Sequence, residues 1–490
     1  MKPYLYQELI KYQNKNIYPF HMPGHKRNLE NEIKNPYHID ITEIDGFDNL
    51  NDPQGIIKKS MEEASEFYGS KKTFYLVNGS TIGILSAISS VCRRGDKLLM
   101  ARNCHKAVYH AVRILDLEPI YLPLIYIEEK KMFGGIDEEK LKEILEEHQD
   151  IKGVIVTSPT YEGIVINIKS IKMLINPHNI PLIVDEAHGA HFPFYDSFPK
   201  SSIYEGADIV IQSLHKTMPS FTQTALLHVC SEDIDVDYVQ EWISMYQSSS
   251  PSYLLMAGIE YSIYYGIEEK QKFEEYYRNL IEYRKKITEL QHISLLEEKD
   301  IKEYGGYALD IGKLVLFFHH TRWTGNEISD ILLNQYQIQI EMSERDYIIA
   351  MSTVCDTKEG FERLYVALKE LDQRISEQIL QEMDFNDQNT AKKEASNYFI
   401  SKKQEYKIKY RPYEALQRKK YKKCLQESIG SCSGAYVYLY PPGIPMLVPG
   451  EVIEEYHISL ILEYKKAGFY VKGIEQDEGN YKIFILDEND

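Results

Sequence analysis

The chain has 490 residues, of which 43% are hydrophobic and 27% are charged, as in ordinary globular proteins. Its 56 Lys and Arg residues against 74 Asp and Glu residues give a formal net charge of −18, so the surface repels phosphate backbones and nucleic-acid binding is not expected. The sequence has no apolar run of about 18 residues, no signal-peptide core and no CxxC pair among its 6 cysteines, so we expect a cytoplasmic protein that does not bind membranes.

An N-terminal arm at 1–35 precedes a predicted large α/β domain at 36–265. Amphipathic helical stretches such as 136–150 alternate with short apolar runs, which favour a parallel sheet covered by helices on both faces. The predicted strands are 73–77, 97–101, 119–127, 153–158, 181–187, 207–213 and 224–229. Ligands of such sheets bind beyond the carboxyl ends of the strands, so functional residues are expected directly after these runs.

Two further units are predicted toward the C-terminus. A charged amphipathic helix at about 258–290 leads into a small α/β domain at 266–375. This domain is expected to be a βαββα module formed by the segments 313–318, 324–336, 338–343, 347–352 and 359–375. Residues 376–490 are predicted to form a lysine-rich linker followed by a C-terminal domain that begins near 435.

A candidate phosphate site follows the first predicted strand. Gly79, Ser80 and Thr81 lie at the start of an apolar helix. Free backbone N–H groups at a helix start, next to two hydroxyls, can hold a phosphate. An ordinary helix cap accounts for the same residues.

A candidate charged site follows the strand at 181–187. A buried carboxylate at Asp185 would need a cationic partner such as a protonated pyridine nitrogen, unless it caps the next helix. Residues 185–188 also spell the DEAH box of helicase-type ATPases. We reject that interpretation because the chain has no GxxxxGK[ST] phosphate loop.

A candidate nucleophile follows the strand at 207–213. An amine such as Lys216, placed among apolar residues, has a lowered pKa and can attack a carbonyl. Ser213 and His215 next to it can hold phosphate oxygens, and His105, after the strand at 97–101, can lie flat on an aromatic ligand. The plain alternatives are an exposed loop lysine and hydrogen-bonded loop histidines.

No metal site is expected. A zinc site is possible on counting alone, but no HExxH or Cys/His spacing supports one. The residues that such a site would use are His21, His25, His188 and His191.

In chain order, the candidates are a phosphate cradle, a stacking histidine, a strand-end aspartate and, 31 residues after Asp185, a lysine (216 − 185). These are the groups that hold pyridoxal phosphate: a phosphate anchor, a ring clamp, a partner for the pyridine nitrogen and an amine. The order of the candidates therefore predicts a pyridoxal-phosphate site.

The chain resembles the Orn/Lys/Arg decarboxylase family of fold-type I pyridoxal-phosphate enzymes along nearly its whole length, and its short bacterial arginine decarboxylases most of all. The matching motifs are PFHMPGHK (19–26), VNGST (77–81), RNCHK (102–106), SPTYEG (158–163), VDEAHGAH (184–191), QSLHK (212–216), SSSPSYLLMA (248–257) and YPPGIPMLVPGE (440–451). The resemblance implies an aspartate-aminotransferase-like α/β fold with a mostly parallel seven-stranded sheet, a small α+β domain and a C-terminal α+β domain.

The resemblance also implies a role for each candidate. Lys216 would hold the cofactor covalently, Asp185 would pair with its pyridine nitrogen, and His105 would stack on its ring. His188 would lie near the ring hydroxyl and the substrate carboxylate. The phosphate would be held by Ser80, Thr81, Ser213 and His215.

The resemblance further implies a homo-oligomer, at least a dimer with shared active sites. Ser248 or Ser249 would reach the phosphate in the neighbouring subunit. The PPGIP segment and Glu451 would lie near the mouth of the site.

The chain departs from the family pattern at two places. The family usually reads Gly-Thr-Ser where this chain has 79–81 in the order Gly-Ser-Thr, which is a mild change. Similar enzymes carry an Arg and a Glu where this chain has Ser431 and Ala435. If those charges help to bind the distal cation of the substrate, Glu427 or Glu451 would have to compensate.

The implied activity is decarboxylation of a basic amino acid to an amine in polyamine metabolism, with arginine as the first substrate and lysine or ornithine next. One alternative is another fold-type I reaction, by an aminotransferase or a lyase, on a cationic amino acid. An aminotransferase needs an Arg for its second carboxylate, and the sequence does not place one. A second alternative is a non-catalytic homologue that binds the cofactor, which the changes at Ser431 and Ala435 favour and the intact Lys216 and Asp185 oppose.

Overall fold

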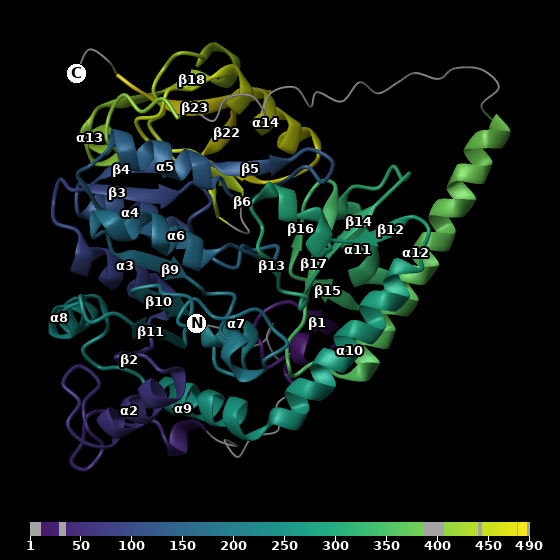
Figure 1. The fold of residues 1–490 in the computed structure, drawn as a ribbon. Helices are drawn as coiled ribbons and strands as arrows, with labels where there is room; N and C mark the ends of the chain where they lie inside the picture. Colours follow the sequence, from purple (N-terminus) through teal and green to yellow (C-terminus); the bar gives the residue numbers. More distant parts are fainter. Residues whose placement is uncertain (1–10, 29–35, 386–405, 440–442, 478, 488–490) are drawn as a thin grey trace, which may run out of the picture.

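The protein is described by a computed structural model that covers residues 11–28, 36–385, 406–439, 443–477 and 479–487, without the side chains of 381–385. A seven-stranded sheet lies at its centre, between layers of helices (Figure 1). The strands in spatial order are β2 (Lys72–Leu76), β11 (Ala225–Val229), β10 (Ile209–Gln212), β9 (Leu182–Asp185), β7 (Ile151–Thr157), β3 (Lys97–Ala101) and β4 (Glu118–Leu122).

The pairing of this sheet confirms the predicted mostly parallel topology. From β10 to β4 all neighbours are parallel, and only β11 runs antiparallel to both β10 and β2. The strands are almost completely buried because helices cover both faces. The elements that alternate with the strands are α2 (Ile56–Tyr68), α3 (Gly79–Val91), α4 (Lys106–Ile114), α5 (Glu138–Glu147), α6 (Ile168–Ile175), α7 (Leu214–Thr217) and α8 (Val236–Tyr246).

One predicted strand is wrong in extent. The run at 119–127 divides into β4 and β5 (Leu124–Ile127), with Pro123 between them. Proline has no N–H to donate to a sheet ladder, so the first strand ends there. β5 then pairs with β6 (Met132–Ile136), a strand that the sequence reasoning missed, and leaves the central sheet as a hairpin.

The predicted helix at 258–290 is also two helices. α9 (Tyr253–Glu268) and α10 (Lys270–Thr288) are separated at Glu269, whose ψ of 42° is not helical. α10 packs against α12 (Lys358–Phe385), and both cover a four-stranded antiparallel sheet. The strands of this small sheet, in order, are β12 (Ile293–Leu295), β14 (Lys313–Phe318), β17 (Tyr347–Met351) and β16 (Met342–Ser343).

The predicted strand at 338–343 is likewise divided. β15 (Ile338–Ile340) pairs with β1 (Tyr18–Phe20) of the N-terminal arm, while β16 stays in the small sheet. Glu341 lies at the break. α11 (Gly325–Tyr336) precedes β15, and the short pair β8 (Ile164–Val165) with β13 (Ala308–Leu309) joins the central part of the molecule to the small sheet.

The C-terminal residues form an α+β unit beside β4 and β5 (Figure 1). Its own apolar core includes Leu425, Val437, Ile461 and Ile483. Its elements are α13 (Pro412–Gln417), β18 (Lys420–Cys424), β19 (Val437–Leu439), β20 (Pro445–Leu447), α14 (Glu455–Lys466), β21 (Val471–Lys472), β22 (Ile474–Asp477) and β23 (Asn480–Leu486). Three residues of the YPPGIP motif, 440–442, lie outside the described residues.

Short 3₁₀ turns complete the structure, at Pro36–His38, Asn176–His178, Phe192–Phe194, Glu298–Asp300, Lys302–Tyr304 and Leu425–Glu427. No helix among the described residues has the length and apolar character needed to cross a membrane.

Candidate active site

A cavity of about 740 Å³ opens at the carboxyl ends of the central strands, where the sequence predicted the functional residues. It lies between the central sheet, the small sheet and the C-terminal unit, because all three contribute to its walls. Six of the predicted residues line it: Ser80, His105, Asp185, His188, His215 and Lys216. The predicted residues that do not line it are Thr81, Ser213, Ser248, Ser249, Glu427 and Glu451.

Lys216 is positioned by α7, which begins two residues after β10 ends. Its Nζ lies 3.1 Å from Nε2 of His188. Burial lowers the pKa of the Lys216 amine, and the negative charge of Asp185 partly opposes this. The amine is therefore more often neutral than an exposed lysine, which is the state that attacks a carbonyl.

Asp185 ends β9 at the middle of the sheet, opposite Thr157 of β7 and Ile211 of β10. The residue is only 3% exposed, and its Oδ1 accepts a hydrogen bond of 3.2 Å from the Ala187 N–H. Burial raises the pKa of the Asp185 carboxyl, and the charge of Lys216 opposes the rise. No described side chain forms an ion pair with Asp185 at 4.0 Å or less. The cationic partner that we predicted for this carboxylate would therefore be a molecule bound in the cavity, which Asp185 lines.

Two histidines flank these residues. His105 is the N-cap of α4, and its Nδ1 accepts a hydrogen bond of 3.2 Å from the Ala107 N–H, which holds the ring in place. Burial and the charge of Lys216 lower the pKa of His105 to about 3, so the ring is neutral. His188 packs edge-on against Tyr161, and its Nδ1 is buried without a hydrogen-bond partner.

The predicted phosphate cradle is only partly assembled around the cavity. α3 begins at Gly79, and Ser80 faces the cavity while Thr81 is exposed. His215 Nδ1 lies 2.9 Å from the Thr224 carbonyl oxygen, and burial lowers its pKa to about 4. The Ser213 hydroxyl is fully buried and has no hydrogen-bond partner.

These observations test whether pyridoxal phosphate fits. The orphaned Nδ1 of His188 and the orphaned hydroxyl of Ser213 are polar atoms that burial should have satisfied within the chain. Asp185 has no cation beside it apart from the nearby Lys216, and a helix start with Ser80 faces the same space. The residues present fit a ring nitrogen, a ring substituent and a phosphate, so they fit the predicted cofactor.

Ser248 and Ser249 are both exposed. The Ser248 N–H donates to Asn78 Oδ1 at 3.3 Å, which places this segment beside the start of α3 but outside the cavity of the same chain.

The two glutamates predicted to bind the substrate lie elsewhere. Glu451 is 1% exposed and its Oε2 accepts hydrogen bonds of 3.0 Å from both Arg102 Nη2 and the Val448 N–H. Its charge is thus balanced inside the protein. Glu427 is exposed at the end of a 3₁₀ turn, away from the cavity lining. The Ser431 hydroxyl accepts from Lys423 Nζ at 3.4 Å, and neither Ser431 nor Ala435 lines the cavity.

The structure adds residues that sequence reasoning did not select. Arg102, inside the RNCHK motif, lines the cavity, but its guanidinium is held by Glu451 and lies 5.0 Å and 4.9 Å from the ring centres of Tyr121 and Tyr406. It is therefore not a free Arg of the kind that an aminotransferase needs. Three glutamates also line the cavity: Glu162, Glu341 and Glu344. Only Glu162, inside the SPTYEG motif, carried any sequence signal.

The four histidines considered for zinc do not meet. His191 Nε2 contacts Asp310 Oδ1 at 3.3 Å, and His21 Nδ1 contacts the Met22 carbonyl oxygen at 2.5 Å. Among the described residues, no three His, Cys, Asp or Glu side chains converge as metal ligands would.

Comparisons with known proteins show the family that this chain is similar to. Residues 3–328 match the sequence family described as Orn/Lys/Arg decarboxylase, major domain. The chain is 32% identical to an arginine decarboxylase of Bacillus subtilis (strain 168) over 492 residues, covering 99% of this chain and 98% of that protein. It is 29% identical to an arginine decarboxylase of Bacillus anthracis, covering 96% and 94% of the two chains.

Solved structures extend the comparison to the fold. The constitutive lysine decarboxylase of Escherichia coli superposes with a TM-score of 0.76 at 19% identity, over 99% of this chain and 82% of that one. Lysine decarboxylase A from Pseudomonas aeruginosa gives a TM-score of 0.76 at 18% identity, over 98% and 80%. These similarities, with the seven-stranded sheet, confirm the predicted fold class.

Proposed function

This chain belongs to the Orn/Lys/Arg decarboxylase family, and on that premise we propose that it is a pyridoxal-phosphate-dependent decarboxylase, which converts a basic amino acid to its amine and CO2. The observation that carries the proposal is the convergence of Lys216, Asp185, His105 and His188 on one buried cavity. Arginine is the first substrate because relatives named arginine decarboxylase align with nearly the whole chain, and lysine and ornithine come next. The amine would enter polyamine metabolism.

We assign the following roles to residues of this chain. Bound pyridoxal phosphate would supply an electron sink for the electron pair left on the α-carbon when CO2 departs. Lys216 is the amine that would hold the group, and Asp185 would keep a proton on its ring nitrogen. The neutral ring of His105 would cover one face and exclude water.

Protons at the reacting carbon have two candidate carriers. Lys216 Nζ and His188 Nε2 lie 3.1 Å apart, so a proton of the amine can pass to the imidazole, and either group would then deliver it to the carbon. Burial and the Lys216 charge lower the pKa of His188, so its ring is neutral and accepts a hydrogen bond from the amine.

The test is direct. The purified, cofactor-loaded protein is incubated with arginine, lysine and ornithine together, and the amines are identified by mass spectrometry, with Lys216→Ala as control. We expect agmatine, or else cadaverine or putrescine, from the wild type only. No amine from a protein that visibly binds the cofactor would contradict the proposal and favour an aminotransferase, a lyase or a non-catalytic homologue.

We propose that the protein acts in the cytoplasm as a homo-oligomer, at least a dimer with shared sites. Ser248 or Ser249 would then reach the phosphate in the neighbouring subunit, which agrees with their exposure beside the start of α3. Sedimentation of the holoenzyme measures the oligomeric state. Replacing both serines by alanine should weaken cofactor retention without dissociating the oligomer.

We also propose the division into an arm at 1–35, a large domain at 36–265, a small domain at 266–375 and a linker with a C-terminal domain at 376–490. The separate apolar core of the C-terminal unit supports the last boundary. α9 crosses the boundary at 265, because it continues to Glu268. Limited proteolysis followed by mass spectrometry locates the actual boundaries.

A further inference from the structure

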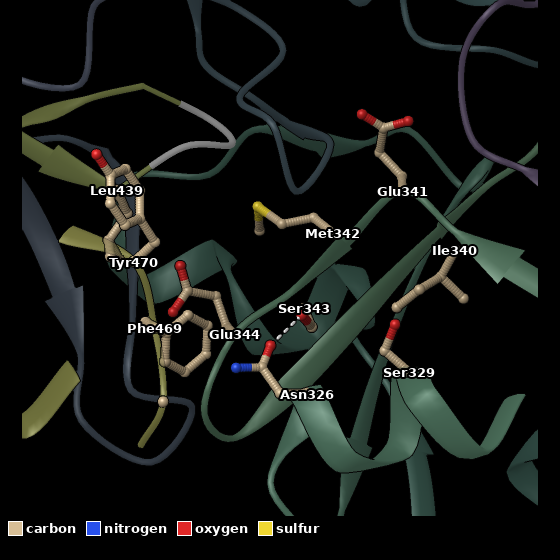
Figure 2. A pocket seen from close by; sticks show the side chains of 11 residues that line it. Asn326, Ser329, Ile340, Glu341, Met342, Ser343, Glu344, Leu439, Phe469 and Tyr470 are labelled. Carbon is tan, nitrogen blue, oxygen red and sulfur yellow. Dashed lines mark hydrogen bonds between the residues drawn. The ribbon is translucent and has the colours of Figure 1, made fainter. Parts of the chain in front are cut away.

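Three glutamates form one side of the cavity, and we call Glu162, Glu341 and Glu344 the acidic wall. Glu162 follows β7, whereas Glu341 and Glu344 stand at the two ends of one extended segment next to β15 and β16. A smaller cavity of about 320 Å³ adjoins the first and shares Glu341 and Glu344 with it. Figure 2 shows this segment, with Glu344 on the side of Leu439 and Phe469 of the C-terminal unit.

No ion pair neutralises the acidic wall, although the charge of Lys313 partly opposes the rise that burial causes in the pKa of Glu162. Elsewhere in the described structure, several buried carboxylates face a cation: Glu451 faces Arg102 at 3.0 Å, Asp310 faces Lys313 at 3.5 Å, and Asp356 faces Lys26 at 3.8 Å. Glu186, in contrast, is held by hydrogen bonds from neutral groups, among them Ser201 Oγ and Gln212 Nε2. No described Lys, Arg or His lies within 4.0 Å of a carboxylate oxygen of the acidic wall. Lys131, which also lines the cavity, pairs with Asp346 at 3.0 Å. Carboxylates that are removed from water without a partner are costly, so this wall is suited to an incoming cation.

Two of the three glutamates of the acidic wall remain available to bind a cation. Glu341 accepts hydrogen bonds from the Met22 N–H, at 2.8 Å, and from the Tyr161 hydroxyl, so both of its oxygens are engaged. Glu162 accepts one from the Tyr347 hydroxyl at 3.2 Å and another from the side chain of Thr160. Glu344 is hydrogen-bonded to Tyr464 of α14. Burial and the neighbouring charge of Glu162 raise the pKa of Glu344 to about 8, and a cation between the two acids would relieve this repulsion.

Glu344 stands on the same extended segment as Glu341, whose charge acts on Lys216. Burial lowers the pKa of Lys216 and the charge of Glu341 opposes this, whereas burial and the charge of Glu162 raise the pKa of Glu344. Three residues of extended chain separate Glu341 from Glu344, or about 10 Å. Lys216, Glu341 and Glu344 all line one cavity, so a basic amino acid held at Lys216 shares this space with both acids.

The backbone that carries these acids is held in place. Gly163, which follows Glu162, has a φ of +94°, and an added Cβ would lie 2.9 Å from Lys313 Cγ. At Gly325 of α11, an added Cβ would lie 2.0 Å from the Glu344 carbonyl oxygen. Only glycine permits either approach, so both acids are held at fixed positions.

The cavity also shows other signs of a missing ligand. His188 is 5% exposed and His457 is 2% exposed, and both line the cavity. Nδ1 of His188 has no hydrogen-bond partner, and Nε2 of His457 has none either but lies 3.8 Å from Glu451 Oε1. Buried polar atoms are almost always satisfied, so unpartnered atoms in the wall of a cavity indicate that a polar molecule fills it.

Resting on the proposed function, we propose that Glu162 and Glu344 bind the distal guanidinium or ammonium of the substrate. They would take the place of the charged residues that similar enzymes carry where this chain has Ser431 and Ala435. The pair is a specificity determinant that sequence reasoning sought in Glu427 and Glu451, one of which is exposed and the other neutralised by Arg102.

The test compares ligands that differ only in the distal cation. Binding of agmatine and of its neutral analogue N-carbamoylputrescine to the holoenzyme is measured by calorimetry, as is binding of cadaverine and of pentylamine. We expect the wild type to prefer the cationic member of at least one pair by more than tenfold. Glu344→Gln and Glu162→Gln keep the shape and remove the charge, and each should reduce this preference by about tenfold to a hundredfold. The KM for the amino acid should rise by a similar factor, with kcat nearly unchanged.

Two controls accompany these variants. Glu463→Gln removes a nearby charge of α14 that is paired with Arg345. This variant should leave the preference for the cationic ligand unchanged. Tyr464→Phe removes only one hydrogen bond to Glu344 and should have an intermediate effect. The absorbance of the bound cofactor shows that each variant still assembles its site.

The outcomes separate this inference from the proposed function. If the wild type forms no amine but still prefers the cationic ligands through Glu344, the inference stands and the decarboxylase proposal fails. If the wild type forms an amine and both Gln variants keep the full preference, the inference is overturned. A loss of preference in Glu427→Gln instead would also overturn it.

Discussion

Two groups of carboxylates at the edge of the cavity differ in whether a cation of the same chain neutralises them. At the seam with the C-terminal unit, Glu451 and Arg102 neutralise each other within 3.0 Å and tyrosine rings surround the guanidinium. On the acidic wall, Glu162 and Glu344 lie close to one another with no described cation within ion-pair distance. A buried carboxylate that is paired within the chain is neutralised there, whereas one that lines a cavity without an ion pair is open to a cationic ligand.

Breaking the paired site should have the largest effect on stability. Arg102→Met leaves Glu451 charged and buried, which should lower the free energy of unfolding by about 3–5 kcal/mol. Chemical denaturation of the holoenzyme measures this change. The double variant Arg102→Met/Glu451→Leu removes both charges and should recover most of the loss. If the double variant is no more stable than Arg102→Met, the unpaired charge of Glu451 is not the cause of the loss.

Removing the charge of Asp185 should affect the reaction more than the fold. Asp185→Asn keeps the hydrogen bond from Ala187 but cannot hold a proton on the ring nitrogen. We expect kcat to fall by about a hundredfold to a thousandfold, as when one preorganised electrostatic group is lost. Substrate affinity should change little because the acidic wall is intact. An unchanged kcat would exclude this role for Asp185.

Titration of Glu344 on the acidic wall should make KM depend on pH. The pKa of Glu344 is raised to about 8, so the carboxyl is mostly protonated below that pH and cannot hold a cation. KM should therefore fall by roughly tenfold as the pH rises from about 7 to 9, since the ionised form becomes dominant. The titratable groups near Glu344 are Glu162, Asp346, Tyr126, Tyr347 and Tyr464. Lys131 is held by Asp346.

The control for this profile is Glu344→Gln, measured over the same pH range. Titration of the substrate amine affects both proteins equally, so only the difference between the profiles reports on Glu344. Parallel profiles would mean that Glu344 does not bind the substrate.

An exposed pair should have the smallest effect. Lys59 and Glu63 of α2 are 77% and 69% exposed and lie 3.7 Å apart. Lys59→Ala should change the free energy of unfolding by less than about 0.5 kcal/mol, because water screens both charges. Chemical denaturation of Lys59→Ala and Arg102→Met under the same conditions compares their free energies of unfolding. A loss of more than about 1 kcal/mol would show that burial does not set the contribution of these pairs.

Parts of the fold could be predicted because their signals are local. Six of the seven predicted strands lie in the central sheet close to their predicted ends, since β-branched runs covered on both faces are continuous in sequence. The hairpin β5–β6, the break at Glu269 and the pairing of β15 with β1 were missed. The pairing of β15 with β1 depends on segments far apart in the chain, which periodicity does not report. The hairpin and the break at Glu269 are local, but the apolar pattern continues through both.

The sequence by itself determined the fold class and the set of residues on the strand ends: Lys216, Asp185, His105 and His188. Parallel strands bring their carboxyl ends to one edge, so order along the chain becomes proximity in space. Which glutamates line the cavity without an ion pair could be seen only in the folded chain. Glu451 is neutralised by Arg102 and does not line the cavity. Glu344 lines it because β15, α11 and α14 meet there. A charge is free or neutralised according to its neighbours, and those neighbours are set by packing between distant segments.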